Sequence, residues 1–466
     1  MNLQNATIDK LKPLAMKVKG VEFIFNPVDL IPFGSDYTED LFFPPAAVCF
    51  PNSVEEVSEI LRFCSQHSLP VYTRGAGTGL SGACLPVRYG LVLSTKNLNK
   101  IISIDTHNLT ITAETGVINA EIKKAVEEHG LYYPPDPASQ ESSTIGGNLA
   151  HGAGGPRAVK YGITRDYVLN LEIVLPSGEV VWTGANTLKN STGFSLTHLM
   201  IGSEGMLGII TKAVLKLIPK PTQELLMVAA FDNLENCAAA VNDVLISKFK
   251  PCAIEFMEKS GIELSMKATQ ASFPIHAQAE AYLLFAFDGF DGEDLFAQAE
   301  GIYKILEPFH PLEIIPAPNG DICHEWWKVR RAIGLAVKQV SAYKEEDTVV
   351  PRASLPSLVR KVKEVGLRYG FQSVCYGHAG DGNLHINILK NNLSQSQWNV
   401  EIPKAVVEIF EHCKALGGTI SGEHGVGLVQ KEYLPIVFDE THYRLMRGIK
   451  KTFDPMNILN PGKWLD

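Results

Sequence analysis

The sequence lacks the cysteine spacing, the long apolar runs and the positive charge that mark three common classes of protein. Its eight cysteines include no C-x-x-C pair, which argues against iron–sulfur clusters and zinc ribbons and fits reduced cytoplasmic thiols. No run reaches the roughly 18 apolar residues of a membrane-spanning helix. Met1 to Gly20 has four lysines and no apolar centre, so no signal peptide is expected. A formal charge of −9 argues against a nucleic-acid partner.

Internal repeats and low-complexity segments are also lacking, so solenoids and disordered tails are not expected. With 466 residues, 45% hydrophobic and 20% charged, the composition is that of a soluble enzyme with two or three domains. A cytoplasmic location follows, with peripheral attachment to a membrane left open.

Glycine is especially dense in one loop, from Arg74 to Ala83. Four glycines fall within eight residues after the apolar run Leu69–Tyr72, which predicts a buried strand. Such a loop permits positive φ, and its successive N–H groups form a concavity for an anion, with Thr78 and Ser81 as further donors. A pyrophosphate is the natural ligand. The loop matches neither the Rossmann fingerprint nor the P-loop pattern.

The surrounding sequence predicts a small β-α-β unit. Ala46–Phe50 reads as a strand, and Ser53-Val54-Glu55-Glu56 is a capping box that opens a helix before the Leu69–Tyr72 strand. A second helix is expected over Asn119–Glu128. A hairpin is expected from Val168 to Trp182. Between these elements, residues 133–156 are rich in proline and glycine and predict a long ligand-binding loop.

A second dense signal lies near the C-terminus. Leu384–Leu389 is expected to be a strand, which would put His385 and Asn387 on one face. His378 precedes a glycine turn that can bring it back towards His385. Ser421–Gly427 then supplies an acid and a base. Two imidazoles and one carboxylate suffice for a divalent metal with open positions. A zinc hydrolase is disfavoured, because no H-E-x-x-H helix is present.

Taken together, R-G-A-G-T-G-L-S-G, P-P-D-P, S-T-I-G-G-N and G-S-E-G-M-L-G-I-I resemble the vanillyl-alcohol-oxidase (PCMH-type) flavoproteins. The glycolate oxidase subunit, D-lactate dehydrogenase and D-2-hydroxyglutarate dehydrogenase branch fits best, from about residue 40 to the end. The resemblance implies an α+β fold, with a two-lobed FAD-binding domain and an α+β substrate domain built on an antiparallel sheet. The segments expected are 1–41 (helical lead-in), 42–221 (FAD-binding), 222–415 (substrate or cap) and 416–466 (C-terminal segment returning to the flavin).

The resemblance also implies the residues of each site. FAD, noncovalent because no histidine follows Arg74 in the glycine loop, would be bound by Arg74, Gly75, Ala76, Gly77, Thr78, Gly79, Leu80, Ser81, Pro135, Asp136, Ser143, Thr144, Gly147, Asn148, Gly154, Tyr161, Glu204, Gly208, Ile210 and Asn460. A divalent metal, zinc first and manganese or iron as alternatives, would be bound by His378, His385 and Glu423. The catalytic residues would be His424 as base, Arg330 for the substrate carboxylate, and Asn387.

The activity implied is oxidation of a small D-2-hydroxyacid, D-lactate or glycolate first, to the 2-oxoacid. D-2-hydroxyglutarate is an alternative substrate. An ether-lipid synthase without net redox chemistry and a non-catalytic FAD electron-transfer subunit are the rival functions. Electrons would pass to a quinone, a cytochrome, an electron-transferring flavoprotein or oxygen. A homodimer is compatible with the sequence.

Overall fold

The computed structural model describes residues 3–38, 40–317 and 319–466, which form two compact units. Unit 1 comprises the described residues of Met1–Gly154, Ile163–Lys220 and Glu423–Asp466. Unit 2 comprises those of Gly155–Gly162 and Pro221–Gly422. The chain leaves unit 1 at the Pro219-Lys220-Pro221 stretch, where proline disfavours continued regular structure.

The first sheet of unit 1 has the order β1-β2-β4-β3 and carries the glycine loop at the end of β3. The strands are β1 (Glu22–Ile24), β2 (Ala47–Phe50), β4 (Leu91–Ser94) and β3 (Val71–Arg74), and helix α3 (Val54–Gln66) connects β2 to β3. Helix α3 begins where the Ser53 side chain accepts the Glu56 N–H, and it buries one apolar face. Strands β2, β4 and β3 are parallel, so the loops after them leave from one edge.

The second sheet of unit 1 is antiparallel, with the order β5-β6-β10-β8-β9. Its strands are β5 (Ile101–Asp105), β6 (Thr110–Glu114), β10 (Ile209–Lys216), β8 (Val168–Val174) and β9 (Val180–Trp182). The short strands β7 (Leu131–Tyr132) and β11 (Ile218–Pro219) pair separately. The described helices of this unit are α1 (Leu3–Lys17), α2 (Pro27–Leu30), α3, α4 (Asn119–Glu127), α5 (Ile145–His151), α7 (Leu196–Met200), α14 (Leu434–Val437) and α15 (Glu440–Phe453).

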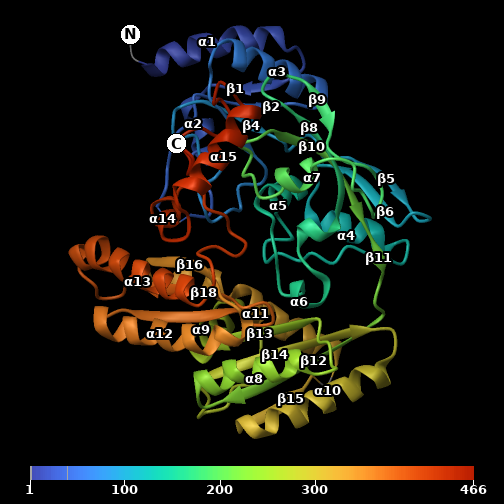
Figure 1. Cartoon of the computed structure of the whole chain (residues 1–466), viewed down its shortest axis with the longest axis vertical. Coiled ribbons are helices and arrows are strands. Elements are labelled where there is room, and N and C mark those ends of the chain that lie inside the picture. Colours follow the sequence, from blue (N-terminus) through green and yellow to red (C-terminus); the bar gives the residue numbers. More distant parts are fainter. Residues whose placement is uncertain (1–2, 39, 318) are drawn as a thin grey trace. The chain divides into compact units, whose positions relative to one another are not determined.

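The C-terminal segment of the chain returns to the strand that carries the glycine loop (blue and red in Figure 1). Leu459 forms a parallel bridge with Val71. The buried ammonium of Lys463 donates to the carbonyls of Gly82 and Leu85, both at 2.7 Å. The end of the chain is therefore hydrogen-bonded to the C-terminal part of the glycine loop.

Unit 2 is built on one antiparallel sheet of seven strands, in the order β15-β12-β14-β13-β17-β18-β16. The strands are β12 (Gln223–Phe231), β13 (Ala253–Glu258), β14 (Ala281–Gly289), β15 (Glu313–Pro316), β16 (Tyr343–Val349), β17 (Gln372–His378) and β18 (Asn383–Leu389). The helices are α6 (Ala158–Tyr161), α8 (Leu234–Ile246), α9 (Lys259–Thr269), α10 (Gly292–Leu306), α11 (Gly320–Val340), α12 (Leu355–Tyr369) and α13 (Ile402–Ala415).

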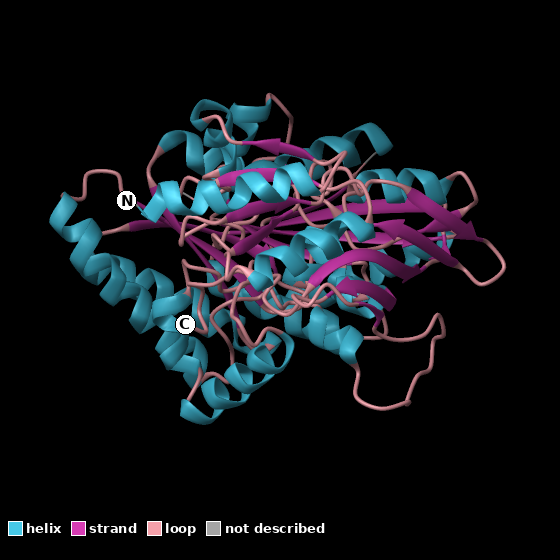
Figure 2. Cartoon of the chain, turned by 90° about the horizontal axis from the view of Figure 1, so that it is seen from above, coloured by secondary structure: helices cyan, strands magenta, loops and turns pink. Residues whose placement is uncertain are grey.

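Helices cover both faces of this sheet. Helices α9 and α11 pack with the strands on one face, where Leu226, Tyr282 and Trp326 join a common apolar core. Helices α8, α10 and α12 contact the sheet as well, and α8 contacts both α10 and α12. Figure 1 labels these helices beside the strands of unit 2, and Figure 2 shows helices in cyan lying along strands in magenta. All seven residues of β18 are buried in consequence, as expected for a central strand covered on both sides.

The observed architecture confirms the α+β class and the antiparallel sheet of the second unit, and it corrects one prediction. The region 133–156, expected to be a loop throughout, contains helix α5. The Thr144 side chain accepts the Gly147 N–H, and this cap stabilises the helix despite its two glycines. The sequence reading also missed the 21-residue helix α11, whose two tryptophans and buried Arg330 face the sheet.

Candidate active site

The glycine loop of unit 1 packs directly against the start of α5. A Cβ on Gly75 would lie 2.3 Å from the Thr144 hydroxyl oxygen, and one on Gly77, where φ is +74°, would overlap the Arg74 guanidinium. Only glycine fits at these two positions. The loop and the S-T-I-G-G-N segment therefore form one surface of backbone N–H and hydroxyl groups, although Gly75 and Thr144 are 69 residues apart in the chain.

Buried polar atoms at this surface lack partners among the described residues. They are the hydroxyl oxygens of Ser81 and Ser143 and the amide nitrogen of Asn148. Each of these side chains is under 5% exposed. Because an unpaired buried polar group is destabilising, such atoms indicate a polar ligand. Hydroxyl and amide donors beside a glycine-rich loop suit the pyrophosphate and the polar ring edge of a flavin dinucleotide, so the residues fit FAD.

The remaining residues that the resemblance assigns to FAD are placed as follows. The Arg74 guanidinium donates to the Ser35 carbonyl at 2.9 Å. Asp136, beside Pro135, is buried, and Ala76, Thr78, Gly79 and Leu80 lie in the glycine loop. Gly154 ends the first segment of unit 1. Tyr161 belongs to unit 2, where its hydroxyl bonds Asp288 at 2.9 Å. Gly208 approaches the Val174 carbonyl, and the Ile210 carbonyl accepts a bond from Thr115.

Two further residues of that set contact other protein groups. The Glu204 carboxylate accepts the N–H groups of Val426 and Gly427 at 2.7 and 2.9 Å. The Asn460 side chain accepts the Thr73 N–H at 3.1 Å and donates to the Glu204 carbonyl at 2.5 Å. Both residues therefore connect the glycine-loop strand to the loop that begins at Glu423.

In unit 2, a row of polar residues crosses four neighbouring strands on the face that α11 covers. Residues directly opposite in an antiparallel pair share a face, and the register pairs Glu255 with His378, Tyr376 with His385, and His385 with Asp347. Asn387, fully buried, lies two residues beyond His385 on the same face. The predicted alternation along β18 thus places His385 and Asn387 as expected.

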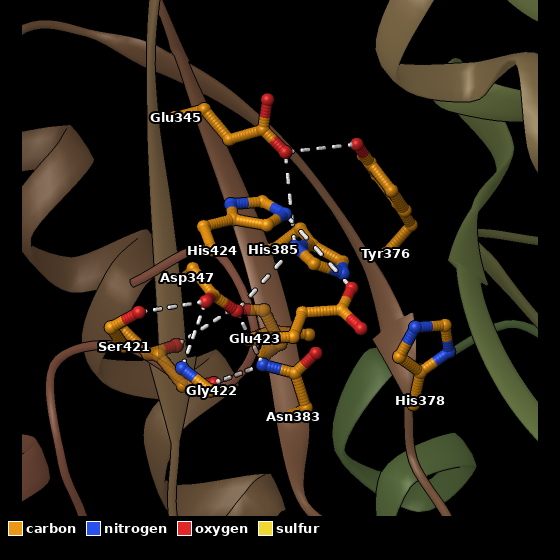
Figure 3. Close-up of polar contacts among 12 residues, drawn as sticks. Glu345, Asp347, Tyr376, His378, Asn383, His385, Ser421, Gly422, Glu423 and His424 are labelled. Carbon is orange, nitrogen blue, oxygen red and sulfur yellow. Dashed lines mark hydrogen bonds and ion pairs between the residues drawn. The ribbon is translucent and has the colours of Figure 1, made fainter. Parts of the chain in front are cut away.

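The two histidines of this row lie close together, with ring centroids 5.5 Å apart and ring nitrogens within 4.8 Å. The Nδ1 atom of His378 bonds the Glu255 carboxylate at 2.9 Å. The Nδ1 atom of His385 lies 3.7 Å from Glu345 and 3.8 Å from Asp347 (Figure 3). The hydrogen bond from Glu255 fixes the orientation of the His378 ring and raises the basicity of its opposite nitrogen, an arrangement found at metal sites, whereas His385 lies near two carboxylates at longer distances.

Arg330 of α11 contacts the same row. Its guanidinium forms a buried ion pair with Glu255, which is 0% exposed, and lies 5.0 Å above the Tyr376 ring. Burial by itself would raise the pKa of Glu255, but the charges of Arg330 and His378 outweigh it and hold that pKa below its usual value. Burial raises the pKa of Tyr376 well above its ordinary value, and Glu345 adds to that rise.

The row also binds the last two residues of unit 2, which directly precede the predicted acid and base in the chain. The Asp347 carboxylate accepts the Ser421 hydroxyl at 3.1 Å and the Gly422 N–H at 2.8 Å (Figure 3). Asn383 donates to the same carboxylate at 2.7 Å. Glu423 follows Gly422 directly, so the Cα atoms of these two residues are about 3.8 Å apart. Within the loop, the His424 Nε2 atom lies 3.9 Å from the Glu423 carboxylate.

Sequence reasoning missed Glu255, Glu345 and Asp347, which hold the histidines, and His151 at the end of α5. A Cβ on Gly425 would lie 2.9 Å from the His151 Nδ1 atom. The acids sit singly on strands whose pairing partners are 31 to 123 residues distant in the chain, so no local pattern marks them.

Comparison with known proteins identifies both units. Residues 45–184 match the model described as "FAD binding domain". Together with the glycine loop and its partnerless polar atoms, this match defines an FAD-binding flavoprotein. Residues 220–464 match the model described as "FAD linked oxidases, C-terminal domain". The chain therefore belongs to the FAD-linked oxidase family and is an oxidoreductase that uses FAD.

Curated relatives match over nearly the whole chain. The glycolate oxidase subunit GlcD of Bacillus subtilis is 36% identical over 97% of this chain and 96% of its own length. A D-lactate dehydrogenase of Archaeoglobus fulgidus is 38% identical over 94% and 96%. A D-2-hydroxyglutarate dehydrogenase of Stutzerimonas stutzeri is 30% identical over 98% of both. The branch inferred from the sequence motifs is confirmed.

Solved structures confirm the fold. A p-cresol methylhydroxylase with substrate bound has a TM-score of 0.81, 18% identity, and coverage of 100% of this chain and 97% of the other. An alkyldihydroxyacetonephosphate synthase has a TM-score of 0.73 and 18% identity, with coverage of 98% and 84%. Within the described part of the chain, no helix combines the length and apolar content needed to cross a bilayer.

Proposed function

We propose that this chain oxidises a small D-2-hydroxyacid, with D-lactate or glycolate as the first candidates, to the corresponding 2-oxoacid. The observation that carries the proposal is the buried row of Glu255, His378, His385 and Arg330 in unit 2. It sits in a chain that belongs to the FAD-linked oxidases, with relatives named for glycolate, D-lactate and D-2-hydroxyglutarate. A purely electron-transferring FAD protein has no need of buried ionisable groups arranged in this way.

The chemistry requires a proton to leave the hydroxyl while a hydride leaves the adjacent carbon. FAD, when bound, would supply the acceptor for that hydride. His424 suits the role of base, because an imidazole titrates near neutral pH. Arg330 is suited to the substrate carboxylate, since a guanidinium offers two parallel donors. Glu255 holds Arg330 and His378 in fixed orientations, which limits the freedom lost on substrate binding.

We also propose that His378, His385 and Glu423 bind a divalent metal, zinc first and manganese or iron as alternatives. Glu255 holds His378 through Nδ1, which directs Nε2 away from that carboxylate. Two imidazoles and one carboxylate match the ligand preferences of zinc and leave a position for substrate oxygens. Such a metal would supply a Lewis acid that lowers the pKa of the substrate hydroxyl, and His424 would remove the proton.

Anaerobic mixing tests the substrate assignment. Purified protein with bound FAD is mixed with D-lactate, glycolate or D-2-hydroxyglutarate, and flavin absorbance is followed, with L-lactate as the control for stereochemistry. We expect rapid bleaching with D-lactate or glycolate, followed by reoxidation with an artificial quinone or dye. Faster bleaching by D-2-hydroxyglutarate would transfer the assignment to that acid. No bleaching by any hydroxyacid would overturn the proposal in favour of an electron-transfer subunit or a non-redox synthase.

A further inference from the structure

We propose that Glu204 is the positioning residue of the loop that carries Glu423 and His424. Its two carboxylate oxygens accept hydrogen bonds from two successive backbone N–H groups of that loop, those of Val426 and Gly427, at 2.7 and 2.9 Å. Glu204 is 4% exposed. An ionised carboxylate that accepts two buried N–H groups makes stronger bonds than a neutral acceptor would. The inference rests on the proposed function only in giving His424 and Glu423 their chemical roles.

The backbone of Glu204 is itself held in an unusual conformation. Its φ is +50°, in the left-handed region that side-chain-bearing residues seldom adopt. The Glu204 N–H donates to the Ala150 carbonyl at 2.9 Å, and the Glu204 carbonyl accepts the Asn460 side chain. Residues other than glycine keep this conformation only when the surrounding structure imposes it, and such residues are frequent at functional sites. The carboxylate is therefore aimed at the loop by contacts on both sides of its own backbone.

The loop is shaped to accept this contact. Gly425 has φ +80°, and a Cβ there would lie 2.7 Å from a Glu204 carboxylate oxygen and 2.9 Å from the His151 Nδ1 atom. Glycine at this position thus lets the loop backbone approach Glu204 closely. The Trp464 indole donates a third bond to the carboxylate, at 3.3 Å.

These contacts join segments that the sequence separates by more than 200 residues. Through Asn460, Glu204 is connected to the Thr73 N–H at the end of the glycine-loop strand. Through its carboxylate, it is connected to the backbone three residues after Glu423. Glu204 therefore sets where the acid and the base stand relative to the FAD-binding strand of unit 1. This role differs from direct contact with the adenine end of FAD, which the sequence resemblance implies for Glu204.

The variant Glu204→Gln tests the inference, because glutamine keeps the side-chain volume but replaces one acceptor with a donor that faces an N–H. The matched control is Glu172→Gln. Glu172 is a buried carboxylate of the same unit, 6% exposed, that bonds Thr211 and Lys212 away from the loop. A second variant, Trp464→Phe, removes the third bond and leaves both loop N–H bonds in place.

We expect Glu204→Gln to keep its FAD and its melting temperature at the level of Glu172→Gln. Flavin reduction by the hydroxyacid should slow by about 10- to 100-fold, since displacement of catalytic groups by about 1 Å has that effect. Hydrogen exchange at the amides of Val426 and Gly427 should accelerate about 10- to 100-fold, the loss expected from charge-assisted bonds. Gly425→Ala should reproduce both effects from the loop side, and Trp464→Phe should produce neither.

Three outcomes would overturn the inference. Loss of FAD from Glu204→Gln but not from Glu172→Gln would make Glu204 a cofactor-binding residue. A lowered melting temperature with an unchanged reduction rate would make its role purely structural. Unchanged exchange at Val426 and Gly427 would show that the bonds do not hold the loop. The exchange measurement needs no substrate, so it decides the inference even if no hydroxyacid reduces the wild-type flavin.

Discussion

Removing the Glu255 carboxylate should destabilise unit 2 more than almost any other single truncation. Glu255 is 0% exposed and contacts both the Arg330 guanidinium and His378. In Glu255→Ala the Arg330 charge, itself 4% exposed, would stay buried without its partner. Breaking a buried ion pair in this way costs about 3–5 kcal/mol. For a unit of roughly 200 residues, each kcal/mol lowers the melting temperature by about 2–4 °C, so a decrease of about 6–20 °C is expected.

Differential scanning calorimetry measures this decrease, and metal titration gives a second, independent readout. Because Glu255 orients His378, its loss should also weaken binding of zinc by about 10- to 100-fold. Glu235→Ala is the control, since Glu235 pairs with Arg360 at the exposed surface, where ion pairs contribute little. A decrease in melting temperature below about 2 °C for Glu255→Ala, or a value equal to that of Glu235→Ala, would refute the reasoning about the buried pair.

The other predictions concern the cofactor, the catalytic loop and a buried lysine. Acid precipitation should release FAD into the supernatant, and flavin retained in the precipitate would contradict noncovalent binding. His424→Ala should keep FAD and metal, but its flavin should be reduced about 10²- to 10⁴-fold more slowly. Glu423→Ala should lose its metal, which elemental analysis measures. Equal metal loss in the two variants would contradict the assignment. Burial lowers the pKa of Lys463 to about 8. Because the unfolded lysine keeps its proton to about pH 10.4, the unfolded chain binds more protons between these values, so this group makes stability rise with pH there. The difference in free energy of unfolding between the wild type and Lys463→Met should shift in favour of the wild type by up to about 3 kcal/mol from pH 8 to 10.4. If the two proteins gave parallel curves of stability against pH, the lowered pKa of Lys463 would be contradicted.

Local patterns in the sequence were sufficient to predict many of the helices, strands and loops. The alternation in Leu384–Leu389 predicted a strand with His385 and Asn387 on one face, and β18 has that form. Ser53 marked the start of α3, and the glycines after Arg74 marked a loop at the end of a strand. These features depend on side-chain periodicity, caps and permitted φ values, which act within a few residues. The motifs were also sufficient to indicate the family and FAD.

Only the tertiary structure decided which groups contact the site residues. Strand register places Glu255 opposite His378 and Asp347 opposite His385, across chain separations that no local pattern reports. Glu204 reaches the loop after Glu423 from more than 200 residues away. Arg330 is buried because α11 packs on the sheet, where its guanidinium pairs with Glu255. Burial and register follow from the packing of whole elements, and they set the charge, orientation and pKa of each group.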